Sequence, residues 1–187
     1  MKTISDEAII LRRFPYGEKD IIFVLFTKYQ GKKRVIAKGV RSITSRRGGH
    51  LDLFNIISLS MREGSGMDLI TEATTLHTLS EVKNNKNLLY VGYYVAELLE
   101  LMLSDEVVES HVFNETVRLL CEINKTKTYV GSQLRSYERY LLSNGGFWSD
   151  EIHGTSIPEG EVKRKEFFQS LIEEVADKRL KTKQWVD

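Results

Sequence analysis

The segment that most restricts the fold of this chain is Ile21–Phe26, with the sequence IIFVLF. A run of β-branched, aliphatic and aromatic residues without a polar interruption is typical of a strand buried on both faces. If such a strand were left exposed, it would pair with other chains and aggregate. A small barrel protects it, because a closed sheet has no free edges.

Four further segments have the composition or alternation of strands. They are Ala8–Arg12, Lys33–Lys38, Phe54–Ser60 and Leu69–Ala73. Two turns separate strands, at Tyr29–Lys32, where Gly31 is expected to have a positive φ, and at Glu63–Gly66. Five short strands with glycine-containing turns predict a small barrel over residues 1–78.

After Leu79 the apolar residues change to helical spacing. Leu88, Val91, Val95, Leu98, Leu99 and Met102 recur three and four residues apart. Further helices are predicted near residues 108–123, 132–142 and 161–178, with a polar loop at 153–160. The predicted class is therefore α+β, with a barrel over residues 1–78 followed by an all-α domain over residues 79–187.

The charge of the chain is unevenly distributed. From Ile21 to Leu51 there are eight lysines and arginines and no acidic residue. Residues 1–80 have a net charge of +5, and residues 81–187 have a net charge of −4. A folded surface with so much positive charge requires a polyanionic partner or a cloud of counterions, which makes nucleic acid the first functional hypothesis. The opposite charge of the second half suggests a different partner there.

Within the basic stretch, Arg34 and Lys38 are predicted on one face of a strand, about 13 Å apart. The segment Gly39–His50 is rich in Gly, Ser and Arg and is interpreted as a mobile basic loop beside that face. Small barrels bind single strands through a basic groove and aromatic stacking. The candidate stacking residues are Phe14, Tyr16 and Tyr29. The alternative interpretation is a solvated face, and Phe14 can equally belong to the core.

One catalytic pattern occurs, S-x-x-K at Ser80–Lys83, but the other motifs of penicillin-binding enzymes are absent, so a helix start is predicted there. The four histidines are scattered without a pair at helical i, i+4 spacing, and the phosphate-binding glycine loops are absent. Cys121 is the only cysteine, which excludes an internal disulfide and a four-thiolate zinc site. It is expected to be an inert core thiol in a reducing cytoplasm. Glu97 and Glu100 are expected at a solvated helix edge, so an enzyme with a bound cofactor is not predicted.

The sequence also resembles the RecO family of bacterial recombination mediators. The similar stretches are Ile10–Arg12, Pro15–Asp20, Gly31-Lys32, Ala37–Arg41, Ser45–Phe54, Glu63-Gly64 and Leu69–Ala73. Their order and spacing match over most of the first 75 residues. The helical half is similar more weakly, at Tyr93–Leu99, Leu134–Gly146 and Arg179–Lys183.

The resemblance implies an N-terminal OB-fold, binding of single- and double-stranded DNA, and annealing of complementary strands. It also implies action with RecR and with the C-terminal tail of the single-stranded-DNA-binding protein SSB in loading a recombinase, at the nucleoid of the bacterial cytoplasm. The predicted DNA-binding residues are Arg12, Arg13, Tyr16, Lys32, Arg34, Lys38, Arg41, Arg46, Arg47 and His50. The candidate partner-binding residues are Lys178, Arg179, Lys181 and Lys183. Neither a small-molecule substrate nor a membrane is expected.

Many members of this family hold zinc with four cysteines between the last helices. This chain lacks those cysteines, and Ser149–Glu161 is too short for such a module. We therefore expect a zinc-free, shortened member of the family, with one helix missing.

The sequence is also compatible with two other functions. An RNA-binding OB-fold protein of translation would have the same barrel, because nothing in the sequence identifies a reader of the 2′-hydroxyl. A protein–protein adaptor without DNA affinity would account for the acidic, apolar helical half.

Overall fold

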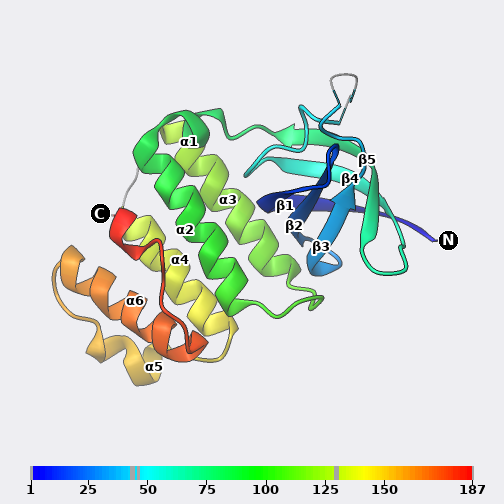
Figure 1. Cartoon of the computed structure of the whole chain (residues 1–187). Helices are drawn as coiled ribbons and strands as arrows, with labels where there is room; N and C mark the ends of the chain where they lie inside the picture. The colour runs from blue at the N-terminus through cyan, green and yellow to red at the C-terminus, as the bar shows by residue number, and fades with distance from the viewer. Residues whose placement is uncertain (1, 43–44, 46, 129–130, 187) are drawn as a thin grey trace.

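The computed structural model describes residues 2–42, 45, 47–128 and 131–186, with a barrel beside a bundle of helices (Figure 1). The strands are β1 (Thr3–Tyr16), β2 (Asp20–Thr27), β3 (Gly31–Ala37), β4 (Ile56–Arg62) and β5 (Asp68–His77). They close in the order β1-β2-β3-β5-β4, with β3 and β5 parallel and the other neighbours antiparallel. This is a five-stranded OB-fold, so the predicted α+β class and barrel are confirmed.

The helices follow the barrel in the chain. They are α1 (Ser80–Asn84), α2 (Lys86–Met102), α3 (Ser110–Thr126), α4 (Gly131–Asn144), α5 (Asp150–His153) and α6 (Glu161–Ala176). Two short 3₁₀ turns, η1 (Gly154–Ser156) and η2 (Lys183–Trp185), complete the elements. The side chain of Asn85 accepts hydrogen bonds from the backbone N–H groups of Asn87 and Leu88, which separates α1 from α2.

Strand β1 is longer than the sequence predicted, because it continues past Arg12 to Tyr16. Its register against β2 shifts between Ile10 and Arg12, as at a β-bulge. A bulge reverses the inward and outward alternation, so the second half of the strand does not continue the apolar pattern of the first. Gly31 has the predicted positive φ, at 71°.

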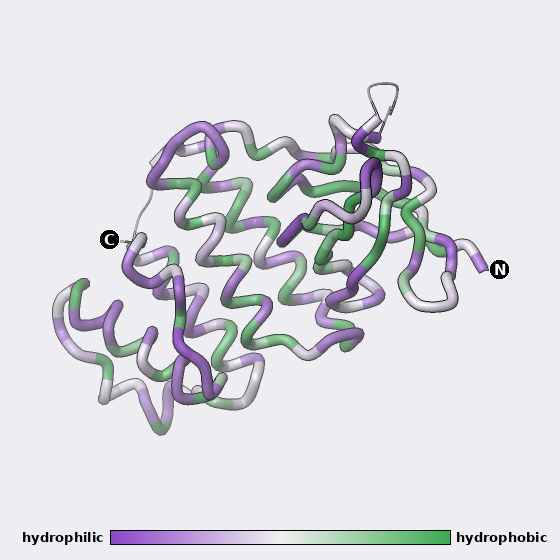
Figure 2. Tube along the Cα trace, in the orientation of Figure 1, coloured by the Kyte–Doolittle hydropathy of each residue, from purple (hydrophilic) through white to green (hydrophobic). Residues whose placement is uncertain are grey.

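Both faces of the IIFVLF strand are buried, as predicted, but against two different cores. Phe23 and Leu25 point into the barrel and pack with residues such as Ile10. Val24 and Phe26 point outward into a second core that includes α2 and α3. The ring centroids of Phe26 and Phe113 on α3 are 5.7 Å apart. Figure 2 shows strongly apolar residues along the barrel strands and recurring along the helices.

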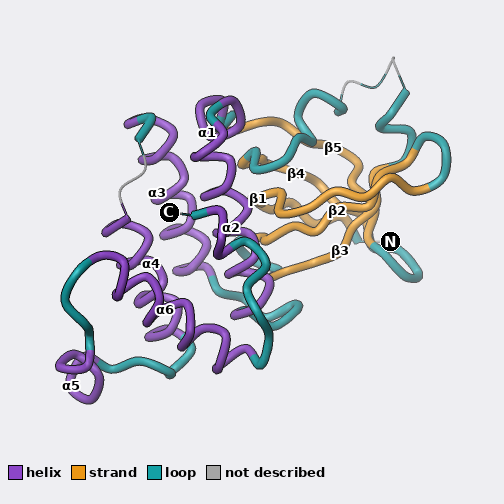
Figure 3. Tube along the Cα trace, turned by 60° about the vertical axis from the view of Figure 1, so that its left-hand side comes forward, coloured by secondary structure: helices purple, strands orange, loops and turns teal. Residues whose placement is uncertain are grey.

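This second core crosses the predicted boundary between residues 78 and 79, which falls between β5 and α1. The barrel and the helices therefore pack directly against each other, with α2 and α3 next to the strands (Figures 1 and 3). The division of the chain into two separate domains stays a prediction.

The C-terminal segment, residues 177–186, returns along α2 (Figure 1). Its anchor is Glu97, which is 7% exposed. The Glu97 carboxylate accepts hydrogen bonds from the backbone N–H of Lys181 at 2.9 Å and from the backbone N–H and hydroxyl of Thr182 at 2.9 and 2.5 Å. The expectation of a solvated edge at Glu97 was wrong, because this segment covers it.

Over the described ranges, every helix is too short or too polar to cross a bilayer. In the same part of the chain, no three His, Cys, Asp or Glu side chains come together as metal ligands would.

Candidate nucleic-acid interface

The outer face of β1, β2 and β3 carries two neighbouring rows of side chains, in which Arg12, Phe14 and Arg34 are exposed and Val24 and Ile36 are buried. In one row Arg12 lies opposite Val24, which lies opposite Arg34. In the next row Phe14, Ile22 and Ile36 are paired in the same way. Residues paired across antiparallel strands project from the same face, so the two arginines lie about 10 Å apart across two strand spacings. We call these two rows the strand face.

Basic residues also gather at the end of the barrel where the turn after β1 meets the residues after β3. The backbone N–H of Arg41 donates to the carbonyl of Lys19 at 3.0 Å, and that of Gly39 donates to Asp20 Oδ1 at 2.8 Å. These bonds bring Lys19, Lys38 and Arg41, which are all exposed, to one end of the barrel. We call these three residues the turn cluster. Tyr16, which is 54% exposed, lies at the adjoining end of β1.

Several predicted DNA-binding residues are exposed and available. Arg34 and Lys38 are exposed, and within the described residues their side chains have no ion-pair or hydrogen-bond partner. Among the described residues, the Arg41 side chain donates one long hydrogen bond of 3.5 Å, to the carbonyl of Gly17. Lys19 was not predicted, because it precedes the acid-free stretch. Its place in the turn before β2 was the sequence signal that could have identified it.

Arg12 and Arg13 are exposed but paired with carboxylates. Arg12 forms an ion pair with Glu100, and Arg13 forms one with Asp52 at 3.0 Å. About half of each arginine side chain is exposed. Ion pairs at such surfaces are worth only about 0–1 kcal/mol. A phosphate can therefore compete with either carboxylate.

Three other predicted residues have structural roles. Lys32 is buried, and its ammonium donates to the carbonyls of Glu100 and Leu103, at 2.9 and 2.8 Å, at the end of α2. Arg47 donates to the carbonyls of Ile70 and Lys38, and His50 hydrogen-bonds the Thr75 hydroxyl. These groups position the loop and α2, so their charge is less available to a ligand.

Arg46 lies outside the described residues. The described parts of the predicted mobile loop contain hydrogen-bonded turns, including one from the N–H of His50 to the carbonyl of Arg47 at 3.1 Å.

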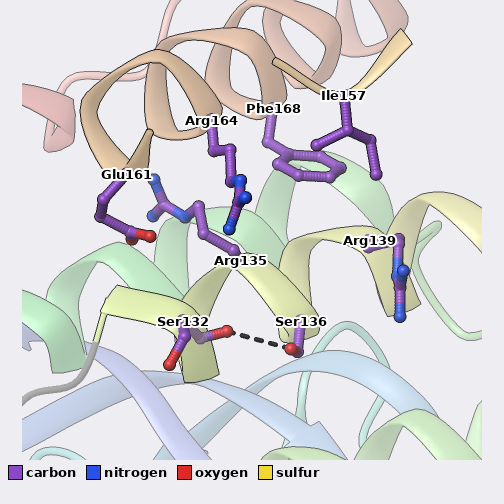
Figure 4. Close-up of a pocket in the computed structure, with 8 residues that line it drawn as sticks. All are labelled: Ser132, Arg135, Ser136, Arg139, Ile157, Glu161, Arg164 and Phe168. Carbon is purple, nitrogen blue, oxygen red and sulfur yellow. Dashed lines mark hydrogen bonds between the residues drawn. The ribbon is translucent and has the colours of Figure 1, made fainter. Parts of the chain in front are cut away.

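A second polar site lies in the helical half, between α4 and α6. It is a pocket of about 290 Å³ lined by Ser132, Arg135, Ser136, Arg139, Ile157, Glu161, Arg164 and Phe168. Figure 4 shows Arg135 reaching up from α4 and Arg164 reaching down from α6, with Phe168 and Ile157 beside them. Three arginines and one glutamate line the pocket, and Arg139 also forms an ion pair with Asp150 at 3.6 Å. We call it the arginine pocket, and the sequence did not predict it.

Arg135 is the most unusual residue of the arginine pocket, because it is only 5% exposed. Its Nη2 donates to Glu138 Oε1 at 2.8 Å, whereas its Nε and Nη1 have no hydrogen-bond partner among the described residues. The same Glu138 oxygen accepts a hydrogen bond from the Tyr94 hydroxyl at 2.5 Å. Burial raises the pKa of Glu138 to about 7, against the opposing effects of Arg135 and Tyr94. Burial therefore opposes ionisation of the carboxyl group that neutralises Arg135.

The predicted partner-binding residues lie elsewhere, along the C-terminal segment. Lys183 forms an ion pair with Glu173 at 2.8 Å, and Lys181 donates its backbone N–H to Glu97. Lys178 and Arg179 are exposed beside Glu173, Glu174 and Asp177. These acids offset much of the positive charge there.

Comparison with known proteins gives consistent similarities. Residues 1–79 match the family described as "Recombination protein O N terminal". The protein named DNA repair protein RecO from Roseiflexus sp. (strain RS-1) is 30% identical over 141 residues, which are 75% of this chain and 49% of that protein. The protein of the same name from Nocardioides sp. (strain ATCC BAA-499 / JS614) is 46% identical over 76 residues, which are 41% of this chain and 31% of that protein. The protein of the same name from Syntrophomonas wolfei subsp. wolfei is 26% identical over 168 residues, which are 84% of this chain and 67% of that protein. This chain thus spans about half the length of the curated relatives that it matches.

Proposed function

Because the chain carries a RecO N-terminal domain and resembles RecO proteins into its helical half, we propose that it is a DNA-binding recombination mediator in DNA repair. It would bind single- and double-stranded DNA without catalysing a covalent reaction, and would anneal complementary strands. The observation that carries this proposal is the set of exposed cations on the OB-fold: Arg34, Lys38 and Arg41 on the strand face and in the turn cluster.

The proposed mechanism is electrostatic and geometric. Arginine and lysine side chains neutralise phosphates and release counterions, which lets two mutually repelling strands approach and pair. Phe14 and Tyr16 are 46% and 54% exposed beside these cations, where they can stack on unpaired bases. The proposed DNA surface retains Arg12, Arg13, Tyr16, Arg34, Lys38 and Arg41 together with the candidate stacking residue Phe14, and it also includes Lys19. Lys32, Arg47 and His50 are assigned to support of the surface.

The test is annealing of two labelled complementary oligonucleotides, with and without SSB bound to them, together with fluorescence anisotropy over a salt series. If about six phosphates are contacted, the logarithm of the association constant K should fall with the logarithm of the salt concentration, with a slope near −4 for a single strand. Annealing of the SSB-coated strands is expected to be accelerated. A flat salt response would contradict the electrostatic mechanism, whereas binding without annealing would favour an RNA-binding protein of translation.

For the partner SSB, we place the proposed site in the arginine pocket and not at Lys178–Lys183. The tail of SSB is short, acidic and apolar, and it ends in a carboxylate. A partly unpaired, buried Arg135 with Arg139 and Arg164 would hold the acidic groups, while Phe168 and Ile157 offer apolar contact. No surface is assigned to RecR.

The tail site is tested with a labelled SSB tail peptide and a matched peptide whose C-terminus is amidated. We expect binding of the free-acid peptide and at least tenfold weaker binding of the amide, because one charge-assisted contact is lost. Arg164→Ala should weaken binding similarly, whereas Lys178→Ala should not. Equal affinity for both peptides would show that the C-terminal carboxylate does not contact the arginine pocket. Loss of binding in Lys178→Ala alone would favour the site predicted from the sequence, at Lys178–Lys183. Peptide binding in a protein without DNA affinity would favour the adaptor alternative.

A further inference from the structure

A groove runs between β1, α2 and the C-terminal segment. It has a volume of about 440 Å³, and its lining includes Arg12, Arg13, Phe14, Tyr93, Lys181 and Trp185. This volume is within the range of small-ligand pockets. The groove begins at Phe14, which belongs to the strand face, and therefore continues the surface proposed above onto the helical half.

Three partly exposed aromatic rings contribute to the groove. Phe14 is 46% exposed, Tyr93 is 39% exposed and Trp185 is 42% exposed. Aromatic side chains of this size stabilise a protein best when they are buried, so three open rings in one groove point to a ligand with a flat apolar surface.

The rings are held in place by the surrounding structure. The centroid of the Trp185 ring is 5.5 Å from that of Tyr90 and 6.4 Å from that of Tyr93. Tyr93 also packs edge-on against the buried ring of Phe54, with the two ring centroids 5.2 Å apart. Three hydrogen bonds to Glu97 fix the backbone just before Trp185. A ligand would therefore meet rings that are already oriented, which lowers the entropic cost of binding.

The charges at the groove also suit an anionic ligand. Arg12, Arg13 and Lys181 supply three cationic side chains to its lining. The carboxylate of Glu97 accepts three hydrogen bonds from the C-terminal segment, and that of Glu100 is paired with Arg12. Lys181 is exposed and has no ion-pair partner among the described residues, whereas a phosphate must displace Glu100 from Arg12 and Asp52 from Arg13. Aromatic faces beside such cations are the combination that binds unpaired nucleotides.

We propose that this groove holds unpaired bases of a single strand of DNA, stacked on Tyr93 and Trp185, with Arg12, Arg13 and Lys181 near the phosphates. This inference rests on the proposed DNA-binding function and extends it from the barrel to the helical half. A base inside a double helix is already stacked on its neighbours and cannot enter the groove. Pairing of two strands would therefore withdraw the bases from Tyr93 and Trp185 and weaken the hold on the annealed product.

Tryptophan fluorescence offers a direct test, because the chain has only two tryptophans. Trp148 is buried, whereas Trp185 lines the groove. In a Trp148→Phe variant, Trp185 becomes the only reporter. Oligothymidylate is expected to quench its fluorescence, and a blunt duplex of equal length is not. The quenching should appear only when the oligonucleotide is long enough to reach beyond the strand face.

Substitutions test the energetic contribution. Trp185→Ala and Tyr93→Ala should each weaken single-strand binding about fivefold or more and leave duplex binding nearly unchanged. Trp185→Phe should retain most of the affinity, which separates loss of stacking from loss of folding. Phe147→Ala is the matched control, because Phe147 is 47% exposed and is not part of the groove lining.

The outcomes separate this inference from the proposed function. If anisotropy shows salt-dependent DNA binding while Trp185 is not quenched and Trp185→Ala binds normally, the groove is excluded and the barrel surface stands. If no DNA binding is detected at low salt, the proposed function fails. Quenching by the SSB tail peptide, with none by oligothymidylate, would overturn the inference in favour of a peptide groove.

Discussion

The barrel and the helical half both present arginines, but they hold them in opposite ways. Arg34 on the barrel is exposed and has no partner among the described side chains, whereas Arg135 on α4 is 5% exposed and shares a buried carboxylate with Tyr94. An exposed guanidinium stays hydrated and can bind any polyanion that brings a negative charge close to it. A buried guanidinium has lost its water and requires an anion in a defined position. The barrel is therefore suited to a regular DNA backbone, and the arginine pocket to one particular anionic group.

The largest effect expected from this difference concerns stability. Glu138→Ala would leave Arg135 buried without its carboxylate and the Tyr94 hydroxyl without its acceptor. We expect the free energy of unfolding to fall by about 3–5 kcal/mol, measured by urea denaturation. Glu115→Ala is a matched control, because Arg118 pairs with Glu115 at the same i, i+3 spacing on an exposed part of α3. It should lose at most about 1 kcal/mol. Equal losses in the two variants would contradict the distinction between buried and exposed arginines.

A smaller effect is expected from pH. Burial raises the pKa of Glu138 to about 7, from 4.5 in an unfolded chain. The folded protein therefore binds more protons than the unfolded one between these values, and the contribution of Glu138 to stability decreases as the pH rises from about 4.5 to about 7. The groups that act on it are Tyr94 on α2, Arg135 on α4, and Glu161 and Lys165 on α6.

This contribution is isolated by comparing the protein with a Glu138→Gln variant across that pH range. The difference between their free energies of unfolding should change by on the order of 1–3 kcal/mol. Binding of the SSB tail peptide should also be tighter near pH 6 than near pH 8, because protonation of Glu138 leaves Arg135 less neutralised. If the difference in free energy of unfolding between the protein and Glu138→Gln were constant with pH, Glu138 would have one protonation state over the whole range.

The barrel could be predicted from sequence because its determinants are local. Two-face burial of IIFVLF, the glycine turn at Gly31 and the change to helical spacing after Leu79 each depend on a few neighbouring residues. The exposed cations Arg34, Lys38 and Arg41 were identified for the same reason, since they stand in an acid-free stretch.

The remaining features depend on residues far apart in the chain. Lys32 was assigned to DNA, but its partners, Glu100 and Leu103, are 68 and 71 residues away. Glu97 was expected in solvent, but it binds Thr182, 85 residues away. The arginine pocket joins α4 to α6, and its glutamate and arginines resemble an ordinary charged helix when they are read locally. Only the packed structure shows which charges have lost contact with water.

The smallest effect, and the most selective, is expected on the strand face. Arg34→Ala should leave the free energy of unfolding within about 0.5 kcal/mol, since the side chain is exposed and has no partner in the described part of the chain. The same substitution should flatten the plot of log K against log salt by about 0.7 for single-stranded DNA, the value for one phosphate. Lys32→Met is the opposite case, because it should destabilise the end of α2 and leave the slope unchanged. If Lys32→Met flattened the slope and Arg34→Ala did not, the assignment of exposed cations to DNA and buried cations to structure would be reversed.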